Sequence, residues 1–297
     1  MKILSFGSLN LDNIYRMPHF IQPGETLACL GREVACGGKG LNQSIALAAS
    51  GADVWHAGCV GEDGAPLAAM LERAGVHTDH LRQVDGPSGH TVIQINPEGE
   101  NGILLCPGAN ARVTPAQAEE TLSAFQPGDL LVIQNEISSL HDIMRMAKAR
   151  GLKIALNPSP LAGAETLPLA LCDWLFLNEA EARFLSGCGE SSAAEDALAR
   201  RFPETRIIVT YGSRGAAACG AGRERLFQPA FPAKAVDTTA AGDTFEGFAL
   251  GCMAAGKPED QCLRFAAQAA AIAVSRLGAA PSIPTMAEVR AALARQG

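Results

Sequence analysis

The stretch AVDTTAAGDTFEGFALG, residues 235–251, decides how the rest of the chain is interpreted. Three small residues, Ala240, Ala241 and Gly242, come directly before Asp243, and an apolar pattern typical of a helix starts there. A helix start presents unpaired backbone N–H groups and the positive end of the helix dipole. Because small side chains leave those groups open, the stretch predicts an anion site beside one carboxylate.

A bound phosphate would repel Asp243 unless that carboxylate had a chemical task. The simplest task is that of a general base, which takes the proton from a hydroxyl group as that group attacks phosphorus. The small-residue loop would stabilise the transferred group. The alternative is that Asp243 is only an acid in the first turn of a helix, where acids are favoured. The stretch by itself leaves both interpretations open.

Composition narrows the class of protein. The chain has 297 residues, 47% of them hydrophobic and 19% charged, which is enough to bury a sizeable core. Its net charge of −7 argues against nucleic acid or an anionic membrane as the main partner. We recognise no signal peptide and no apolar run of the roughly 20 residues that a membrane span needs. Nine scattered cysteines without a C-x-x-C pair indicate reduced thiols, so we expect a cytoplasmic protein.

Strand-like runs alternate with helix-like segments along most of the chain, which predicts an α/β fold with a mainly parallel sheet. The predicted strands are KILSFGS, DVWHAGCV, DLLVIQ, KIALN, WLFLN and RIIVTYG, and the predicted helices include residues 39–50, 66–74, 115–125 and 140–150. Residues 26–34 and 90–106 read as strands without helices, with a hairpin turn at NPEGEN. We interpret them as a small projecting β-sheet. No repeat or linker divides the chain, so we expect a single domain over residues 1–297.

These motifs resemble the ribokinase-type family of carbohydrate and nucleoside kinases. DTTAAGDTF matches the family's C-terminal signature, and GGKGLNQSIALAASGA, residues 37–52, matches its N-terminal one. Shorter motifs follow the family's order up to RLGAAPSIP at residues 276–284; they are GSLNLD, PGET, PGAN, NPSP, NEAE and GSRG. The resemblance implies a ribokinase-like three-layer sandwich with a mainly parallel central sheet. It also implies a β lid with strands from about residues 11–36 and 88–106.

The resemblance also implies roles for individual residues. Asp243 would be the catalytic base, with Ala240, Ala241 and Gly242 supplying the anion hole. The sugar would be held by Asn10, Asp12, Gly38, Lys39, Asn42, Glu136 and Asp243, and Asp12 would accept a hydrogen bond from a sugar hydroxyl. ATP would contact Asn178, Glu181, Thr210, Gly212, Ser213, Gly215 and Gly242, and Glu181 would organise a hydrated Mg²⁺ ion.

Plainer interpretations exist for several of these residues. Asn10 and Asp12 could be turn formers, and Glu136 could cap a helix. NEAE could be a capped helix start with a solvated acid at Glu181. Other nucleotide-binding motifs fit less well. GGKGLN is no Walker A loop, because position 33 is Glu and no Ser or Thr follows Lys39, and no G-x-G-x-x-G supports a nicotinamide dehydrogenase.

The resemblance further implies a potassium ion beside the anion loop. The residues around it would be Asp237, Thr239, Ala273, Arg276, Gly278 and Ser282, mostly through backbone carbonyls. Hard oxygen ligands suit such an ion, which would fix the loop before phosphate arrives. The alternative is that Asp237 caps the loop by itself.

We therefore expect an ATP-dependent sugar kinase that acts on a primary hydroxyl, with ribose as the leading substrate. His90 and Thr91 are bulkier and more polar than the small apolar residues usual at the matching lid positions. They leave a fructokinase-like enzyme or a nucleoside kinase as alternatives within the family. A catalytically silent sugar-binding protein is the alternative from another class, although the intact Asp243 and anion loop count against it.

The projecting sheet predicts a homodimer. Leu27, Leu30, Val92 and Ile95 would be exposed on it, together with strand edges that proteins normally cover. Two such sheets packed together would cover both features, and the resemblance implies the same arrangement. The alternative is that each sheet folds onto its own cleft.

Overall fold

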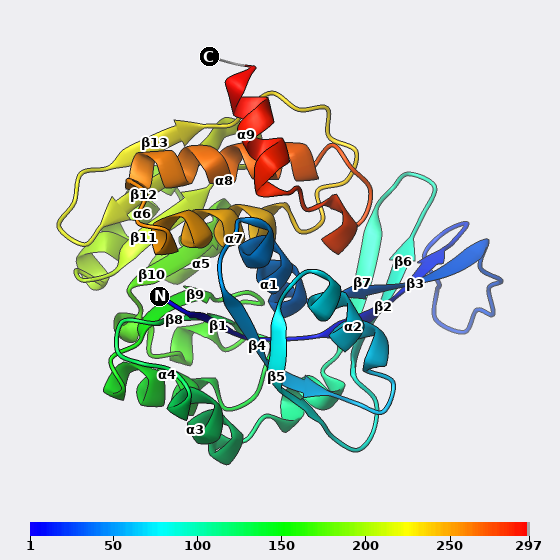
Figure 1. Ribbon diagram of the computed structural model, residues 1–297. Coiled ribbons are helices and arrows are strands. Elements are labelled where there is room, and N and C mark those ends of the chain that lie inside the picture. Colours follow the sequence, from blue (N-terminus) through cyan, green and yellow to red (C-terminus); the bar gives the residue numbers. More distant parts are fainter. Residues whose placement is uncertain (296–297) are drawn as a thin grey trace.

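The computed structural model describes residues 1–295, and within them a main sheet of nine strands runs through the molecule (Figure 1). Its strand order is β13-β12-β11-β10-β9-β8-β1-β4-β5, parallel from β5 to β11 and antiparallel at β12 and β13. The bounds are β1 Ile3–Phe6, β4 Val54–Val60, β5 His77–Gln83, β8 Leu130–Gln134, β9 Lys153–Asn157, β10 Trp174–Asn178, β11 Arg206–Thr210, β12 Gly215–Gly220 and β13 Leu226–Pro229.

Helices cover both faces of the main sheet. One apolar core includes side chains of α3 Pro115–Ser123, α4 Leu140–Ala149, α5 Glu179–Ser186 and α6 Ser191–Arg201. The other includes side chains of α1 Lys39–Ala49, α2 Ala65–Arg73, α7 Ala241–Ala254, α8 Glu259–Ala273 and α9 Met286–Ala294. Short 3₁₀ helices are η1 Gly108–Arg112, η2 Ala164–Thr166, η3 Leu169–Leu171, η4 Gly212–Arg214 and η5 Ala280–Ser282. Strands buried on both faces explain the continuous apolar runs, and the predicted three-layer α/β sandwich is confirmed.

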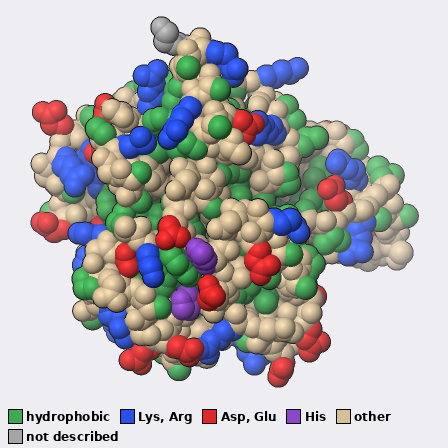
Figure 2. All heavy atoms as spheres, in the orientation of Figure 1, with side chains coloured by type: hydrophobic (Ala, Val, Ile, Leu, Met, Phe, Trp, Pro, Cys, Tyr) green, Lys and Arg blue, Asp and Glu red, His purple; other side chains and the backbone are tan. Residues whose placement is uncertain are grey.

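A second, small sheet projects from the main body, at the right in Figure 1. Its strands are β2 Asn10–Arg16, β3 Gly31–Gly37, β6 Gly89–Ile95 and β7 Asn101–Cys106, in the order β3-β2-β6-β7. The hairpin predicted at NPEGEN is present, and Asn96 N donates a hydrogen bond to Glu100 O across it at 3.1 Å. Figure 2 shows hydrophobic side chains together with charged ones on this projecting part, and charged side chains of both signs are spread over the rest of that face as well.

Two predictions about the small sheet are wrong in detail. The strand expected at residues 26–34 runs from Gly31 to Gly37, because its ladder with β2 extends only from Arg16↔Gly31 to Asn10↔Gly37. Of the four residues expected to be exposed, only Leu30 is, with 71% exposure; Leu27, Val92 and Ile95 are half-buried. The last two lie on β6, which is flanked on both sides by other strands. The exposed apolar side chains are instead on β3 and β7, at Val34, Ile103, Leu104 and Leu105.

The predicted strands of the main body and the predicted helices are confirmed to within a few residues. β5, β12 and β13 were not predicted, because HTDHLRQ and GAAACG lack a strong strand pattern. Within residues 1–295, no helix combines the length and the hydropathy needed to cross a membrane.

Candidate active site

Asp243 lies in the first turn of α7 and is buried, with 6% exposure. Its carboxylate oxygens accept hydrogen bonds from Asn42 Nδ2 at 3.2 Å and Gln43 Nε2 at 3.0 Å, and Lys39 Nζ lies 3.8 Å from Oδ1. All three partners belong to the start of α1, where positions 39, 42 and 43 share one helix face. The negative charge of Asp243 raises the pKa of Lys39. Two helices therefore hold one carboxylate between amide donors and a cation.

Small residues bring these helices together. A Cβ atom at Gly247 of α7 would lie only 2.4 Å from the Cβ of Ala46 on α1, so a larger residue would push the helices apart. The loop before α7 has the opposite property. A Cβ atom at Gly242 would meet no atom within 4 Å, and Ala240 enters the helix with φ 59°. The first turn of α7 has no side-chain cap, and of its N–H groups Ala241 N donates to Thr238 O at 3.2 Å, which leaves the N–H groups that follow for a ligand, as expected of an anion site.

The small sheet supplies Asp12, which lies on β2 at the junction with the main body. Thr91 of β6 is paired with it in register, and Thr91 Oγ1 donates a hydrogen bond to Asp12 Oδ1 at 2.6 Å. Burial raises the pKa of Asp12. A Cβ atom at Gly37 would lie 2.0 Å from Asp12 Oδ2, so a larger residue there would displace this carboxylate. Asn10 begins the same strand but is buried, and its Oδ1 accepts a hydrogen bond from Asn110 Nδ2 at 2.8 Å.

Glu136 connects these groups to α1. Its Oε2 accepts hydrogen bonds from Lys39 N at 3.3 Å and from Ser8 Oγ. Burial raises the pKa of Glu136, and the positive charge of Lys39 opposes that shift. Gly38, with φ 98°, turns the chain from β3 into α1 beside the backbone of Ser8. The structure thus gathers Gly38, Lys39, Asn42, Glu136 and Asp243 around the start of α1, with Asp12 at the adjoining edge of the small sheet.

A cleft of about 1020 Å³ runs from Asp243 along the ends of the main-sheet strands. Every residue predicted to contact ATP lines it: Asn178, Glu181, Thr210, Gly212, Ser213, Gly215 and Gly242. Lys39, Ala240, Ala241 and Asp243 also line it. The apolar side chains of Phe231, Ala267, Ala270 and Val274 form a wall suited to a flat ring.

Asn178 and Glu181 do form the capped helix start that was the alternative interpretation of NEAE. Glu181 N donates to Asn178 Oδ1 at 2.9 Å, and Asn178 N donates to Glu181 Oε2 at 2.8 Å. Glu181 is nevertheless 7% exposed, so it is a buried acid of the cleft and not the solvated one which that interpretation assumed. Both residues can still contact a ligand. Asn178 Oδ1 can accept a second hydrogen bond, and the cap uses only Oε2 of Glu181, which leaves Oε1.

The segments predicted to hold potassium lie side by side. Asp237 Oδ1 accepts hydrogen bonds from Thr239 N at 2.9 Å and Thr239 Oγ1 at 2.6 Å, and Asp237 Oδ2 accepts one from Gly278 N at 3.0 Å. The guanidinium of Arg276 pairs with Glu288 at 2.6 Å. Ser282 is buried, and its Oγ donates a hydrogen bond to the carbonyl of Ala279, the residue that follows Gly278. Ala273 is also buried, in the last turn of α8. Both oxygens of Asp237 are thus already engaged by protein donors, as in the capping alternative.

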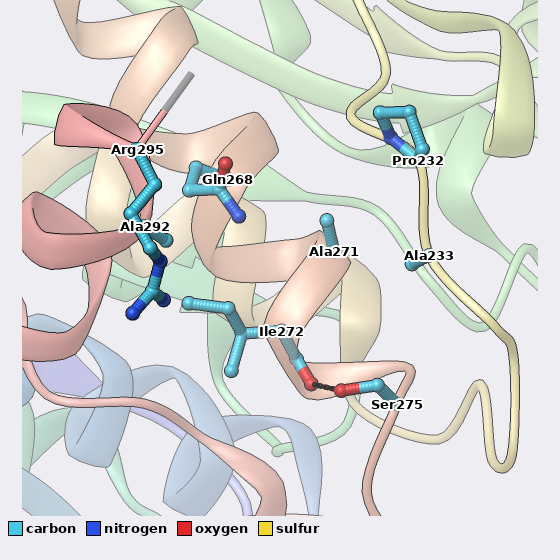
Figure 3. Close-up of a pocket in the computed structure, with 8 residues that line it drawn as sticks. All are labelled: Pro232, Ala233, Gln268, Ala271, Ile272, Ser275, Ala292 and Arg295. Carbon is cyan, nitrogen blue, oxygen red and sulfur yellow. Dashed lines mark hydrogen bonds between the residues drawn. The ribbon is translucent and has the colours of Figure 1, made fainter. Parts of the chain in front are cut away.

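A smaller cavity of about 250 Å³ lies between α8, α9 and the Pro232–Ala233 segment (Figure 3). In Figure 3, Gln268, Ala271 and Ile272 of α8 lie between Arg295 and Ala292 on the left and Pro232 and Ala233 on the right. Arg295 is the one charged side chain among its described lining residues, and none of the predicted site residues borders it. The larger cleft is therefore the candidate active site.

Sequence reasoning missed three side chains of the site. Gln43 directly follows Asn42, the last residue of GGKGLN. For Thr91 the sequence indicated only that it is bulkier and more polar than usual. Glu246 lies three residues after Asp243. Glu246 is 1% exposed and lines the cleft. Its signal was a second acid near the start of α7, at a spacing that shares a helix face with Asp243.

Comparisons with known proteins agree with this geometry. The sequence pattern of the pfkB family carbohydrate kinases matches residues 1–286. Ribokinase of Haemophilus influenzae is 35% identical over 292 residues, which cover 95% of each chain. Among solved structures, ribokinase of Thermotoga maritima superposes with a TM-score of 0.88 at 33% identity, covering 99% of each chain. Arabidopsis thaliana ribokinase, solved with ribose and ATP, gives a TM-score of 0.84 at 28% identity, covering 98% of each chain. The family resemblance expected from the motifs is confirmed.

Proposed function

Because this chain belongs to the pfkB family of carbohydrate kinases and is an ATP-dependent sugar kinase, we propose that its substrate is ribose and its product ribose 5-phosphate. The choice of ribose is supported by ribokinases that match nearly the whole chain. The observation that carries the proposal is Asp243, a buried carboxylate between the cleft, which is lined by the residues predicted to contact ATP, and the group of polar side chains around α1.

In the proposed reaction, Asp243 accepts the proton of the primary hydroxyl as the hydroxyl oxygen attacks the γ-phosphorus of ATP. The bond from phosphorus to the β,γ-bridging oxygen breaks, and ADP leaves with that oxygen. The N–H groups at the start of α7 stabilise the transferred phosphoryl group. Lys39, 3.8 Å from Asp243, supplies positive charge at the same place. Asp12, Asn42 and Glu136 orient the sugar, and Asn10 holds the strand that carries Asp12.

Magnesium fits the nucleotide end of this cleft. Glu181 is a buried acid that lines the cleft, and Asn178 positions it through the cap. Within residues 1–295 there is no group of three or more His, Cys, Asp or Glu that could hold a metal ion directly. The donor set therefore suits an ion that keeps its waters and is bound mainly through phosphates. When bound, the ion neutralises the charge of the phosphates.

The test of the substrate is a screen of magnesium-dependent ADP formation with ribose, fructose and a set of nucleosides. We expect kcat/KM for ribose to exceed that for every other acceptor by at least about tenfold, which corresponds to about 1.4 kcal/mol. A preference for fructose or a nucleoside would move the enzyme to the corresponding alternative. An absence of turnover with every acceptor, despite ATP binding, would support the catalytically silent binding protein.

We also propose that potassium binds beside the anion loop. The support is the adjacency of Asp237, Thr239 and Gly278, and the ion pair of Arg276 with Glu288, which occupies the guanidinium. The test compares kcat/KM in potassium chloride with that in a large organic cation at equal ionic strength. A several-fold rise with potassium that Asp237→Ala abolishes is expected. Equal rates in the two salts would favour the capping role of Asp237 alone.

The small sheet is proposed to act as a lid and as the interface of a homodimer. Its support is the row of exposed apolar side chains, with Leu104 62% and Ile103 60% exposed. We expect light scattering at micromolar concentration to give twice the monomer mass, and Leu104→Lys to give the monomer mass. A monomer mass for the unmodified protein would instead support a lid that covers only its own cleft.

All nine cysteines are free, which supports action in a reducing compartment such as the cytoplasm.

A further inference from the structure

Glu246 is a buried acid of the cleft for which the proposed mechanism has no task. It lies one turn after Asp243 in α7, so the two side chains leave the same face of the helix. Its side chain is 1% exposed, yet it lines the cleft together with Lys39, Asn178 and Glu181. A glutamate that faces both the catalytic base and the nucleotide end of the cleft is well placed to contact what binds there.

The two carboxylate oxygens of Glu246 differ in their surroundings. Oε2 accepts a hydrogen bond from Gln43 Nε2 at 3.1 Å, and the same nitrogen donates to Asp243 Oδ1 at 3.0 Å. Gln43 is fixed in turn, since its Oε1 accepts a hydrogen bond from Gln134 Nε2 at 2.6 Å. Oε1 of Glu246, in contrast, is buried and forms no hydrogen bond of normal geometry within the described part of the chain, although the Asn157 side chain, which also lines the cleft, lies near enough to lower the pKa of Glu246. An unpartnered buried carboxylate oxygen is unfavourable, so a ligand that supplies a donor would stabilise this arrangement.

The charges around Glu246 narrow the chemistry of that ligand. Asp243 and Glu181 add negative charge, and Lys39 is the cation that opposes them. Burial and the charge of Asp243 raise the pKa of Glu246 well above its ordinary value. A phosphate alone would be repelled by the carboxylates of Asp243 and Glu181, and it would bring no positive charge to favour the ionised form of Glu246. A hydrated divalent cation, in contrast, brings positive charge together with O–H donors.

We propose that Glu246 Oε1 accepts a hydrogen bond from the hydration shell of the divalent cation that accompanies the nucleotide. Glu246 then adds a second carboxylate to the one that Glu181 supplies. This inference rests on the magnesium site of the proposed function. It requires no direct ligation, which agrees with the lack of a three-ligand cluster among residues 1–295. Through α7, the base Asp243 and a partner of the metal–nucleotide complex are held on one rigid element.

The test is Glu246→Gln, with binding as the readout. Glutamine keeps the shape of the side chain and can turn its carbonyl oxygen toward Gln43 Nε2, which leaves an NH₂ group in the place of Oε1. We expect Mn²⁺ to bind the enzyme–ADP complex about tenfold more weakly, as measured by electron paramagnetic resonance, since partners behind a metal typically contribute this much. ADP affinity in EDTA, measured by calorimetry, should stay within about twofold.

The control is Glu119→Gln on the exposed surface of α3, which removes the same charge far from the cleft and should leave Mn²⁺ binding unchanged. If Glu246→Gln has a lowered melting temperature, Glu246→Met repeats the test with a side chain of similar length that has no hydrogen-bond acceptor in the place of Oε1. Unchanged Mn²⁺ affinity in the Glu246 variants would overturn the proposal. So would an equal loss of ADP affinity with and without metal, because Glu246 would then act only by holding Gln43. A wild-type protein that binds Mn²⁺ and ADP but phosphorylates no ribose would remove the assigned sugar and leave this inference standing.

Discussion

The main sheet and the small sheet differ in how much of each is buried. All five residues of β8 in the main sheet are buried, because helices cover both of its faces. In β7 of the small sheet, five of six residues are exposed. The packing of a covered sheet contributes to the free energy of folding, whereas the exposed apolar side chains of an uncovered sheet are available to bind a ligand or a partner. Substitutions in the main sheet should therefore change stability, and substitutions in the small sheet should change binding.

The largest effect is expected where the two regions meet, at Asp243. Asp243→Asn cannot accept the proton of the sugar hydroxyl, so kcat should fall by about 10²–10⁴, the range for loss of a general base. ADP affinity, measured by calorimetry, should stay within a few-fold, and the melting temperature should change little. A variant with near-normal kcat would end the assignment of Asp243 as the base.

The next effect concerns stability alone, at the far end of β11. Arg206 is buried and makes a double ion pair with Glu259, with both N···O distances 2.9 Å, and it also donates to the carbonyls of Gly220 and Glu224. Arg206→Met should lower the free energy of unfolding by about 3–5 kcal/mol, because it leaves a carboxylate and two carbonyls without donors. Urea titration measures this change.

The control for Arg206 is the double variant with Glu259→Met, which removes the stranded carboxylate and should recover part of the lost stability. Both variants should retain wild-type KM values for sugar and ATP wherever they are folded. A large change in KM with unchanged stability would contradict the contrast between the two sheets.

A smaller effect on stability is expected from His56 in β4. The ring is buried, Ser44 Oγ lies 2.8 Å from its Nδ1, and burial lowers its pKa to about 3. The unfolded chain takes up a proton below about pH 6.5 while the folded protein does not, so stability falls as the pH drops from about 6.5 toward 3. Between pH 7.5 and 5.5 this amounts to about 1.4 kcal/mol. Urea titrations at both pH values should show that His56→Gln loses this part of the pH dependence; an unchanged slope would contradict it.

The smallest effect is expected in the small sheet, at Thr91. Thr91→Val keeps the shape of the side chain but removes the 2.6 Å hydrogen bond to Asp12. Without this hydrogen bond Asp12 is less well oriented, and we expect the free energy of sugar binding to weaken by about 1 kcal/mol. KM for the sugar should therefore rise about fivefold, whereas kcat, KM for ATP and the melting temperature should stay nearly unchanged. Thr91→Ser should restore the wild-type KM. If KM stays the same while stability falls, Thr91 belongs to packing and not to recognition.

Much of the candidate site could be predicted because its signals are local. The first turn of α7, the glycine-rich start of α1 and the cap at Asn178 each lie within a few residues of sequence, and all of them face the cleft. The strand at residues 26–34 was misplaced for the opposite reason. Its limits depend on how far β2 extends beside it, and strand pairing cannot be read from one strand alone.

By itself, the sequence determined the alternation of strands and helices, the family and the chemical types of the site residues. Only the tertiary structure decided which of them meet. Gln43 and Asp243 are 200 residues apart, and Thr91 and Asp12 are 79 apart, yet each pair shares a hydrogen bond. It also decided that one oxygen of Glu246 is held and the other is unpartnered. Hydrogen bonding and burial depend on distances across packed elements, whereas periodicity and capping depend only on neighbours along the chain.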